Sequence, residues 1–312
     1  MRGIVYKSTG NLYLVHTDSK EVYKCSIKGK FRSLGIKSTN PIAVGDQVNF
    51  EIINKEDFTG VINKIEYRKN YIVRKSVNLS KFSHIIASNV DCCFLFVTPS
   101  NPLTSSIFID RILVATKSFG INTVILFSKT DIYSKNDTKY INNLRSIYSK
   151  IGYKCLDISV LKEINIDKII EIMKHKISIF TGHSGVGKSS LLNLLDPALN
   201  IKTAKISKQN EQGRHTTTYA EMYDLNFGGR IIDSPGIKGF GLIDIEKNEL
   251  GGYFSEFRLL QNDCKFNDCL HEKEPKCAVK EAVLNGLISE SRYKSYLSLL
   301  VNENKSFRTE NK

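Results

Sequence analysis

The sequence lacks any apolar run that approaches the roughly 18 residues needed to cross a membrane as a helix. It also lacks a basic amphipathic helix of the kind that rests on a membrane surface. The first twenty residues already include Arg2, Lys7, Asp18 and Lys20 among glycine and polar positions, which an export signal does not do. We therefore expect a cytoplasmic protein without a membrane partner.

The sequence is poor in acidic residues relative to basic ones. Its 312 residues include 45 Lys and Arg but only 32 Asp and Glu, which gives a net charge of +13. Residues 1–75 hold 14 basic and 7 acidic residues, whereas residues 246–312 hold 11 of each. Such an excess favours a polyanionic partner, nucleic acid before membrane, although a basic surface that serves only solubility remains an alternative. The length predicts roughly two or three domains.

A disulfide pattern is also lacking, although the chain has seven cysteines. Four of them are isolated or lie in apolar stretches, and we expect them to behave as small buried apolar side chains: Cys25, Cys92, Cys93 and Cys155. The other three gather with a histidine in "CKFNDCLHEKEPKC", where Cys264, Cys269, His271 and Cys277 are separated by four, one and five residues. Three thiolates and an imidazole predict one closed, structural Zn²⁺ site, with unligated thiols as the alternative.

Residues 1–75 are predicted to form a small barrel. Five short strand-like segments lie between glycine, asparagine and proline, from "GIVYK" to "TGVINKIEY". So basic a segment favours an OB-type barrel that binds RNA, although an SH3-like barrel without a ligand would have a similar pattern. The expected RNA-binding residues are Lys28, Lys30, Arg32, Arg68, Lys69 and Arg74.

Strand and helix patterns alternate over residues 76–245, and residues 246–312 form a mainly helical domain around the Cys/His cluster. "VDCCFLFV", "INTVILF" and "YKCLDIS" are predicted strands, separated by amphipathic helices that end near Gly120 and Gly152. The helix after the first strand is expected to bury Ile107, Ile109, Leu113 and Val114. This alternation predicts a mainly parallel sheet whose ligands bind beyond the carboxyl ends of its strands.

A strand, a glycine-rich loop and a helix follow one another in "ISIFTGHSGVGKSSLLNLL". The glycines let the backbone wrap around phosphates, Lys188 reaches the β and γ phosphates, and Ser189 offers a hydroxyl to Mg²⁺. This segment predicts a nucleoside triphosphate site formed by Gly182, His183, Ser184, Gly185, Val186, Gly187, Lys188, Ser189 and Ser190.

Two later segments resemble nucleotide switches. "RIIDSPG" places Asp233 where a carboxylate can reach Mg²⁺ and Gly236 where its N–H can contact the γ phosphate. "GRHTTT" offers Thr217, which with Ser189 is expected to bind Mg²⁺. Ile237 stands where many GTPases have a water-positioning glutamine, so His215 is a candidate catalytic residue, with a plain switch-loop or RNA-facing role as the alternative.

The segment "FSKTD" precedes the phosphate loop and is predicted to read guanine. Asp131 can accept hydrogen bonds from N1–H and the 2-amino group of guanine, two donors that adenine lacks, and Lys129 can lie along the base. Thr130 and Ser159, which follow two of the predicted strands, complete the base end. Ser128 is shorter than the usual asparagine, so we expect guanine preference to persist and affinity to fall.

In the order base reader, phosphate loop and switches, this chain resembles the circularly permuted bacterial GTPase family RsgA. The resemblance runs from "VGDQV" and "YRKNYIVRK" through "SKTD", "GHSGVGKSS", "GRHTTT" and "DSPGIKGFGL" to the Cys/His cluster. It implies an N-terminal OB barrel, a permuted P-loop GTPase domain and a helical zinc domain. It also implies binding to the small (30S) ribosomal subunit and its 16S rRNA, near the decoding region. Ser128 departs from the family's asparagine.

These observations together predict an α/β GTPase that acts late in small-subunit maturation as a monomer, with GTP hydrolysis stimulated by the subunit and coupled to release. Two alternatives remain at this point. One is an RNA-binding scaffold that binds nucleotide and hardly hydrolyses it, which Ile237 and Ser128 favour. The other is an ATP-using P-loop kinase, which Asp131 and the two switch segments disfavour.

Overall fold

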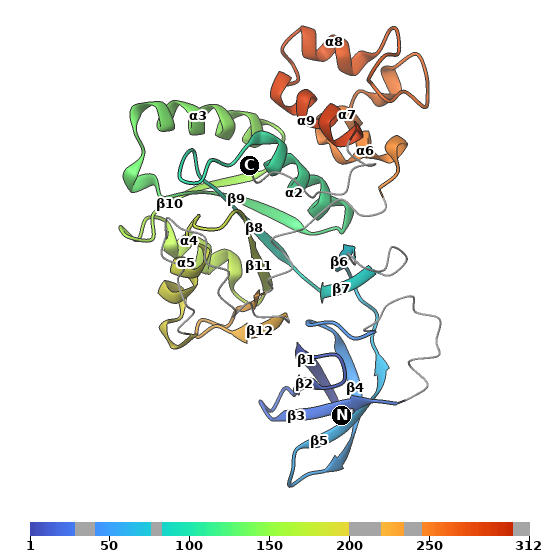
Figure 1. The fold of residues 1–312 in the computed structure, drawn as a ribbon, viewed down its shortest axis with the longest axis vertical. Coiled ribbons are helices and arrows are strands. Elements are labelled where there is room, and N and C mark those ends of the chain that lie inside the picture. The colour runs from blue at the N-terminus through green and yellow to red at the C-terminus, as the bar shows by residue number, and fades with distance from the viewer. Residues whose placement is uncertain (29–40, 76–82, 200–219, 234–244, 302–312) are drawn as a thin grey trace, which may run out of the picture.

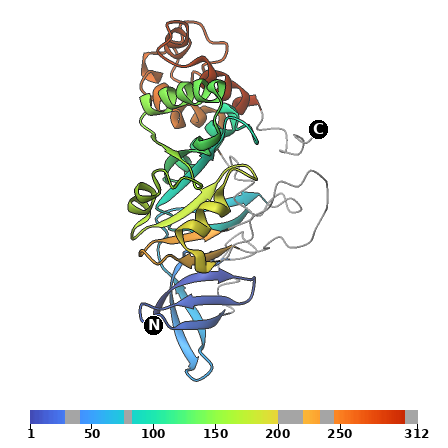
Figure 2. The ribbon, with the colours of Figure 1, turned by 90° about the vertical axis from the view of Figure 1, so that its left-hand side faces the viewer.

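The computed structural model describes residues 1–28, 41–75, 83–199, 220–233 and 245–301, which form three regions along one long axis. A small barrel lies at one end, a sheet flanked by helices lies in the middle, and a group of helices lies at the other end (Figure 1). The view after a quarter turn keeps the same order along the axis (Figure 2). The order of the regions in space therefore follows their order in the sequence.

The N-terminal barrel is closed by five strands, β1 (Arg2–Ser8), β2 (Tyr13–His16), β3 (Val22–Ile27), β4 (Gln47–Asn54) and β5 (Thr59–Ile65). The strand order is β1-β2-β3-β5-β4, and β4 returns to pair with β1. The β3–β5 pair is parallel and the other pairs are antiparallel. Alternate side chains point inward and form a separate core that includes Tyr13, Tyr23 and Phe50. The predicted OB-type barrel is confirmed.

The central region is a mainly parallel sheet, as predicted. Its strands are β8 (Cys92–Val97), β9 (Asn122–Ser128), β10 (Lys154–Ile158), β11 (Ile177–Thr181), β12 (Glu221–Asp224) and β13 (Arg230–Asp233). They lie in the order β10-β9-β8-β11-β13-β12, and β12 is antiparallel to its neighbour. The phosphate-loop strand β11 therefore lies between β8 and β13, in the centre of the sheet.

Helices cover both faces of this sheet because its central strands are apolar on both sides (Figure 1). On β8, Cys93, Leu95 and Val97 join one core with α2 (Ser106–Ser118) and α3 (Lys135–Lys150). The alternate residues Phe94 and Phe96 join a second core with α4 (Ile166–Met173) and α5 (Lys188–Leu195). The helix α2 buries Ile109, Leu113 and Val114 as predicted, but the prediction for Ile107 was wrong because it faces solvent in the first turn.

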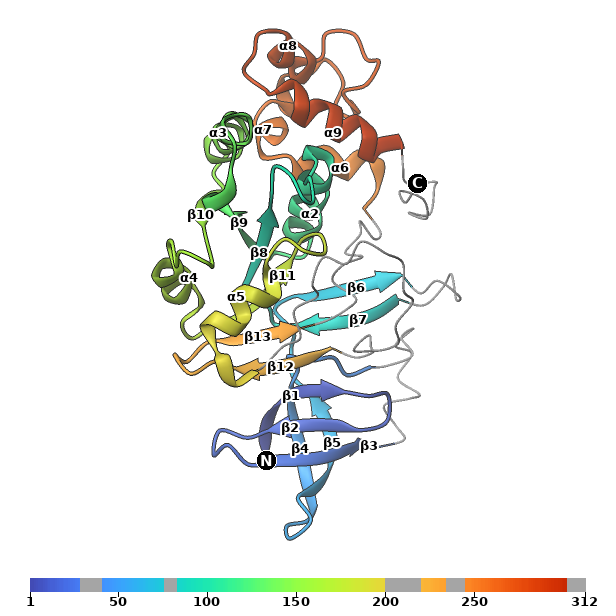
Figure 3. The same cartoon turned by 60° about the vertical axis from the view of Figure 1, so that its left-hand side comes forward.

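The barrel and the central sheet are joined edge to edge. Strand β1 pairs with β12 at Lys7 and Glu221, and the two side chains form an ion pair of 3.0 Å. Beside them, the Tyr6 hydroxyl donates to Asp224 at 2.6 Å, and Arg230 donates to the same carboxylate at 3.1 Å. Eleven strands of the described residues thus belong to one continuous sheet (Figure 3).

A short hairpin connects the barrel to the first strand of the central sheet. It consists of β6 (Tyr71–Lys75) and β7 (Ser83–Ser88), which pair with each other in a two-stranded sheet. The boundary at residue 75 that we expected from the sequence falls between these two strands. The hairpin carries the chain from one region to the next.

The C-terminal region consists of α6 (Lys247–Tyr253), α7 (Ser255–Arg258), α8 (Ala278–Leu284) and α9 (Glu290–Val301). These helices surround a fourth apolar core, to which Val114 of α2 also belongs. Arg292 of α9 is buried and donates to Asp110 of α2 at 2.6 Å and to Glu256 of α7 at 2.7 Å. The C-terminal helices are therefore fixed to the central region through α2. Within the described ranges, no helix has both the length and the apolar character that crossing a membrane demands.

Candidate nucleotide and metal sites

The loop between β11 and α5 has the backbone that its glycines allow. Gly182, Gly185 and Gly187 all have positive φ angles, of 139°, 81° and 104°. At Gly182 an added Cβ would lie 2.8 Å from the carbonyl oxygen of Phe96, which is too close for any side chain. Val186 is fully buried beneath the loop, whereas Ser184, Gly185 and Ser190 face solvent. One side of the loop is thus packed against the protein core, and the other side is open to solvent.

Two side chains of the loop hold its shape. The Lys188 ammonium donates to the carbonyl oxygens of Gly182 at 2.8 Å and His183 at 2.6 Å. The His183 ring stacks on Phe108 of α2 with 4.0 Å between ring centroids. Burial lowers the pKa of His183, and the charges of Arg111 and Lys188 lower it further. His183 is therefore held as a neutral ring between the phosphate loop and α2.

Ser128, at the end of β9, is buried and its hydroxyl donates to the carbonyl oxygen of Val186 at 2.9 Å. The sequence led us to expect that a serine would do less than asparagine here. The structure shows that Ser128 still braces the phosphate loop. An added Cβ on Gly187 would lie 3.2 Å from the Ser128 oxygen, so the two segments are in close contact.

The other residues of "SKTD" lie beside the end of β10. Lys129 has a left-handed backbone and donates to Asn101 O at 3.0 Å, while Thr130 donates to Ile158 O at 3.1 Å. The Ser159 hydroxyl donates to a carboxylate oxygen of Asp131 at 2.6 Å. Asp131 is thereby held in place at the carboxyl end of the strands. These segments are adjacent because β9 and β10 run parallel in register.

The metal-side residues lie on the other flank of the phosphate loop. Ser189, Lys188 and Asp233 line one small cavity of about 40 Å³ between α5 and the end of β13. A hydroxyl and a carboxylate are oxygen ligands of the kind that Mg²⁺ prefers, and Lys188 lies beside them. The predicted base, phosphate and metal residues that the structure describes thus meet at one edge of the sheet. Three predicted residues of this site lie outside the described residues: His215, Thr217 and Gly236.

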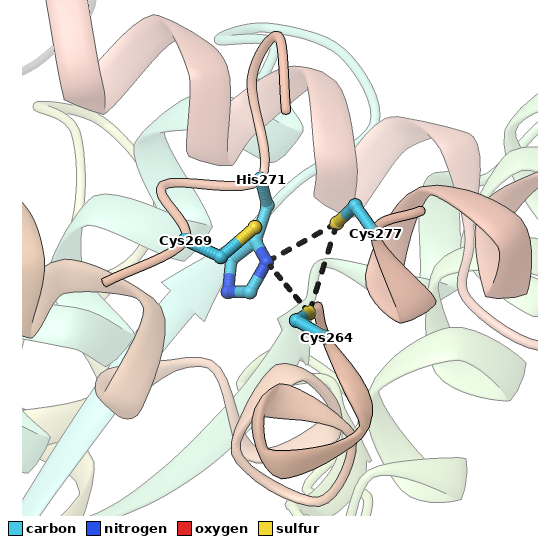
Figure 4. Close-up of side chains that lie close together, drawn as sticks. All are labelled: Cys264, Cys269, His271 and Cys277. Carbon is cyan, nitrogen blue, oxygen red and sulfur yellow. Dashed lines mark hydrogen bonds between the residues drawn. The ribbon is translucent and has the colours of Figure 1, made fainter. Parts of the chain in front are cut away.

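The four predicted metal ligands lie together between α7 and α8 (Figure 4). Their ligand atoms are all within 4.8 Å of one another. Cys264 Sγ lies 3.9 Å from Cys277 Sγ, and His271 Nδ1 lies 3.6 Å and 3.3 Å from these two sulfurs. Zinc–sulfur bonds of about 2.3 Å in a tetrahedron place two sulfurs about 3.8 Å apart. The geometry therefore fits a metal ion with this ligand set.

The surrounding residues hold the cluster in shape. The hydroxyls of Tyr293 and Tyr296 in α9 donate to the carbonyl oxygens of His271 and Leu270, each at 2.7 Å. Glu274 accepts hydrogen bonds from three backbone N–H groups in the loop that carries His271. The helix α9 thus orients the metal cluster at one point and contacts α2 at another.

The basic residues expected to bind RNA lie in different environments. The Arg68 guanidinium makes hydrogen bonds inside the protein. Its Nε donates to Asp46 Oδ1 at 2.6 Å, and another of its nitrogens donates to Pro41 O at 2.7 Å. Asp46 is fully buried and also accepts from Ser88, so Arg68 is occupied inside the protein. Lys28 pairs with Glu51 at 3.1 Å, and Lys69 pairs with Asp91, both at the surface. Lys30 and Arg32 lie outside the described residues, and so does the side chain of Arg74.

Sequence reasoning missed two residues that connect the sites. Phe108 supports His183 through ring stacking, and Arg292 joins the C-terminal helices to α2. In the sequence, Arg292 is simply a charged residue beside the apolar face of α9. Charged residues stand in this position in exposed helices too, so the sequence did not indicate that Arg292 is buried. Both contacts join residues far apart in the sequence, so no local pattern predicts them.

Comparison with known families agrees with this architecture. Residues 65–243 match the family model described as RsgA GTPase, and residues 2–62 match the one described as RsgA N-terminal domain. A curated protein of Flavobacterium psychrophilum named small ribosomal subunit biogenesis GTPase RsgA is 54% identical over 311 residues, which covers 99% of this chain and 95% of the relative. A Bacteroides fragilis protein of the same name is 49% identical over 300 residues, 96% of each chain.

Two solved structures have the same fold over nearly the whole chain. The crystal structure of YjeQ from Thermotoga maritima has a TM-score of 0.79 and 36% identity, and covers 96% of each chain. The structure of YloQ, which its title calls a circularly permuted GTPase, has a TM-score of 0.75 and 30% identity and covers 99% of this chain and 96% of that one. The likeness includes the barrel, the central sheet and the C-terminal helices.

Proposed function

We propose that this chain, which belongs to the RsgA GTPase family, is a GTPase that acts on the small ribosomal subunit during the biogenesis of that subunit. The curated relatives bear that name, and two of them are about half identical to this chain over nearly its whole length. The observation that carries the proposal is the hydrogen bond from Ser128 to Val186 O, which joins the base-reading segment to the phosphate loop. One nucleotide can therefore contact both segments.

In this proposal, guanine binds at Asp131 and the phosphates bind over the loop. The Asp131 carboxylate, now held by the Ser159 hydroxyl, accepts from N1–H and the 2-amino group of the base. Ser128, Lys129, Thr130 and Ser159 shape this end. The glycine-rich loop from Gly182 to Ser190 surrounds the phosphates, and Lys188 exchanges its two carbonyl contacts for phosphate oxygens. Specificity for GTP then follows because adenine leaves the carboxylate without donors.

When bound, Mg²⁺ would supply positive charge that offsets the negative charge of the phosphates. Ser189 and Asp233 are the described residues that we propose hold it, because both line the cavity beside Lys188. Thr217 and Gly236 are proposed to complete the γ-phosphate end, and His215 to help position the attacking water. All three assignments rest on the sequence and on the family.

The C-terminal cluster is proposed to hold one structural Zn²⁺. Three cysteines and one histidine fill a tetrahedral shell and leave no position for water, which favours a structural over a catalytic ion. We also propose that the chain consists of a barrel (1–75), a GTPase domain (76–245) and this zinc domain (246–312). The zinc then stabilises the loop between α7 and α8.

The partner is proposed to be 16S rRNA within the small subunit, contacted by a monomer in the cytoplasm. Lys28 and Lys69 lie at the surface, and each can exchange its acidic partner for a phosphate at low cost because exposed ion pairs are weak. Lys30, Arg32 and Arg74 are proposed to extend this surface. Arg68 contributes by fixing the barrel in place rather than by facing the RNA.

The test is to measure GTP and ATP hydrolysis with and without purified small ribosomal subunits. We expect GTP hydrolysis that the subunit strongly stimulates and that Lys188→Ala abolishes, whereas His215→Ala slows only the stimulated rate. Subunit binding without stimulation would instead favour an RNA-binding scaffold, and a preference for ATP would refute both functions. Subunit release after hydrolysis is checked by sedimentation with GTP and with a non-hydrolysable analogue.

A further inference from the structure

A second cavity lies at the edge of the central sheet opposite to the nucleotide residues. It has a volume of about 600 Å³ and is lined by the first residues of β8, β9 and β10 and the residue before β11. The ends of α2, α3 and α4 and the start of α7 complete its wall. This volume is within the range of small-molecule sites, roughly 300–1,000 Å³. Its position at the amino ends of the strands separates it from the phosphate loop.

Three lysines from different elements line this cavity: Lys117 at the end of α2, Lys154 at the start of β10 and Lys176 just before β11. In the ranges that the structure describes, the ammonium groups of Lys154 and Lys176 make no ion pair. Lys117 donates only to the Ser255 hydroxyl, at 2.8 Å. The lining thus carries more positive than negative charge.

The one acidic residue in the lining is Asp91, and its carboxylate is already occupied. One oxygen pairs with Lys69, and the other accepts from the backbone N–H of Ile177 at 2.8 Å. Burial raises the pKa of the Cys92 thiol to about 12, the charges of Lys176 and Lys154 oppose this rise, and the charge of Asp91 adds to it. The lining thus holds three ammonium groups and one carboxylate whose two oxygens already have partners.

An ordinary explanation of these lysines is that they balance helix dipoles. The carboxyl-terminal ends of α2, α3 and α4 meet this cavity, and each carries about half a negative charge. Three such ends offset about one and a half of the three positive charges. Lys117 lies in the last turn of α2 and fits this role, but Lys154 and Lys176 lie four and three residues beyond the last residues of α3 and α4, where the helix dipole is weaker. More than one positive charge remains.

We propose that this cavity binds a phosphate-bearing anion with at least two negative charges. Two unpaired ammonium groups need more than one charge, and lysines bind phosphate as point charges without strict geometry. Neutral donors are also present. Ser255 accepts from Lys117 and keeps its own proton to donate, and the side-chain amide of Asn122 faces solvent at the rim. The source of the phosphates is either a free diphosphate group or the backbone of an RNA strand.

The site is separate from the proposed GTPase function and does not depend on it. Nothing in its lining belongs to the base, phosphate or metal residues. Asp91 of the lining pairs with Lys69, one of the residues proposed to contact RNA, which favours RNA as the source. Binding can therefore be measured without ribosomal subunits.

The experiment is calorimetric titration of the full chain, saturated with GDP so that the phosphate loop is filled. One arm uses inorganic pyrophosphate and the other uses a short oligouridylate. The test variant is Lys154→Glu/Lys176→Glu, and the control is Lys139→Glu, an exposed lysine of α3 that is absent from the cavity lining. All substituted positions face solvent, so we expect these variants to fold.

We expect the wild-type chain to bind the probe. The affinity should fall about tenfold or more in the test variant and stay unchanged in the control. If pyrophosphate gives this pattern, the site takes free phosphorylated ligands. If only oligouridylate does, the phosphates come from RNA. Absence of binding to both probes, or equal loss in the test and control variants, would overturn the proposal. A failure of subunit-stimulated GTP hydrolysis would leave this result untouched.

Discussion

At the scale of single residues, Ser128 decides how the base-reading and phosphate-binding segments meet. Its hydroxyl is buried and donates to Val186 O, a carbonyl of the loop itself. An asparagine has a second polar atom that can reach the base edge, and serine has none. Ser128 therefore keeps the contact with the phosphate loop that an asparagine would make, but not the contact with the base. Any loss of affinity should come from the base contact alone.

We predict that Ser128→Ala weakens GDP and GTP binding roughly 5- to 30-fold, because a buried carbonyl left without its donor costs about 1–2 kcal/mol. The preference for GTP over ATP should remain, since Asp131 and Ser159 are untouched. Ser26→Ala, at an exposed position of the barrel strand β3, is the control. Equilibrium binding with labelled nucleotides measures both constants. Unchanged affinity in Ser128→Ala would show that the hydrogen bond does not support the loop.

His183 gives the stability of the chain a predicted pH dependence. Its pKa in the folded state lies below the unfolded value of about 6.5, so the unfolded chain binds more protons in that range. The free energy of unfolding should therefore fall as the pH drops below about 6.5. Urea unfolding at neutral and mildly acidic pH should show a smaller fall in His183→Gln than in the wild type. Burial also lowers the pKa of His16 and His271. The wild type and His183→Gln both retain these two residues, so the difference between the two proteins reports on His183. Equal pH dependence would contradict the prediction.

At the scale of secondary-structure elements, α2 connects the phosphate loop to the C-terminal helices. Phe108 in its first turn stacks on His183, and Asp110, half a turn further, pairs with Arg292 of α9. Asp110 also accepts from the Tyr148 hydroxyl of α3 at 2.7 Å. Burial raises the pKa of Asp110, and the charge of Arg292 opposes that rise. The pair is stable only while both partners are present.

We predict that Arg292→Leu lowers the free energy of unfolding by about 3–5 kcal/mol, because it leaves buried carboxylates without their cation. Asp110→Asn in the same chain should recover part of this loss. The control is Lys294→Leu on the same helix, whose exposed pair with Glu290 is worth less than about 0.5 kcal/mol. Chemical denaturation gives all four values. Similar losses in Arg292→Leu and Lys294→Leu would refute the role of the buried pair.

The sequence predicted most elements because their signals are local. Glycine spacing predicted the turns of the phosphate loop, alternation predicted the five barrel strands, and the Cys/His spacing predicted the metal cluster. What it missed depends on contacts across the fold. The environment of Arg68 is set by Asp46, which lies 22 residues away, and that of Ile107 by which face of α2 meets the sheet. No pattern within a few residues encodes such contacts.

At the scale of the whole molecule, the metal cluster and the nucleotide residues are stabilised by different cores. The cluster belongs to the core of the C-terminal helices, whereas the phosphate loop rests on the core around α4 and α5. Among the described residues they are joined mainly through α2, which contacts α9 at Arg292 and α7 at Ser255, and through Lys150 of α3, which donates to Leu287 O. Damage to one should therefore leave the other largely intact.

We predict that chelation of the metal exposes the segment between α7 and α8 to proteolysis while GDP affinity changes less than about twofold, because structural metals stabilise chiefly the segments that bind them. Cys269→Ser should reproduce the effect, and Cys155→Ser, which lies outside the cluster, should not. Limited proteolysis with mass spectrometry identifies the cleaved segment. Loss of GDP binding on chelation would contradict this prediction and indicate that the metal site and the nucleotide site are coupled through α2.

The pairing of β1 with β12 also has a consequence for the chain as it is synthesised. Lys7 and Glu221 are 214 residues apart, so β1 leaves the ribosome long before its partner exists. At about 5–20 residues per second, the wait is roughly 10–40 seconds. The barrel can close through β4 in the meantime, but the end of β1 near Lys7 stays exposed as an unpaired edge. A nascent chain of this protein is therefore most open to wrong strand pairing in that interval, and a chaperone that covers such edges would matter most there.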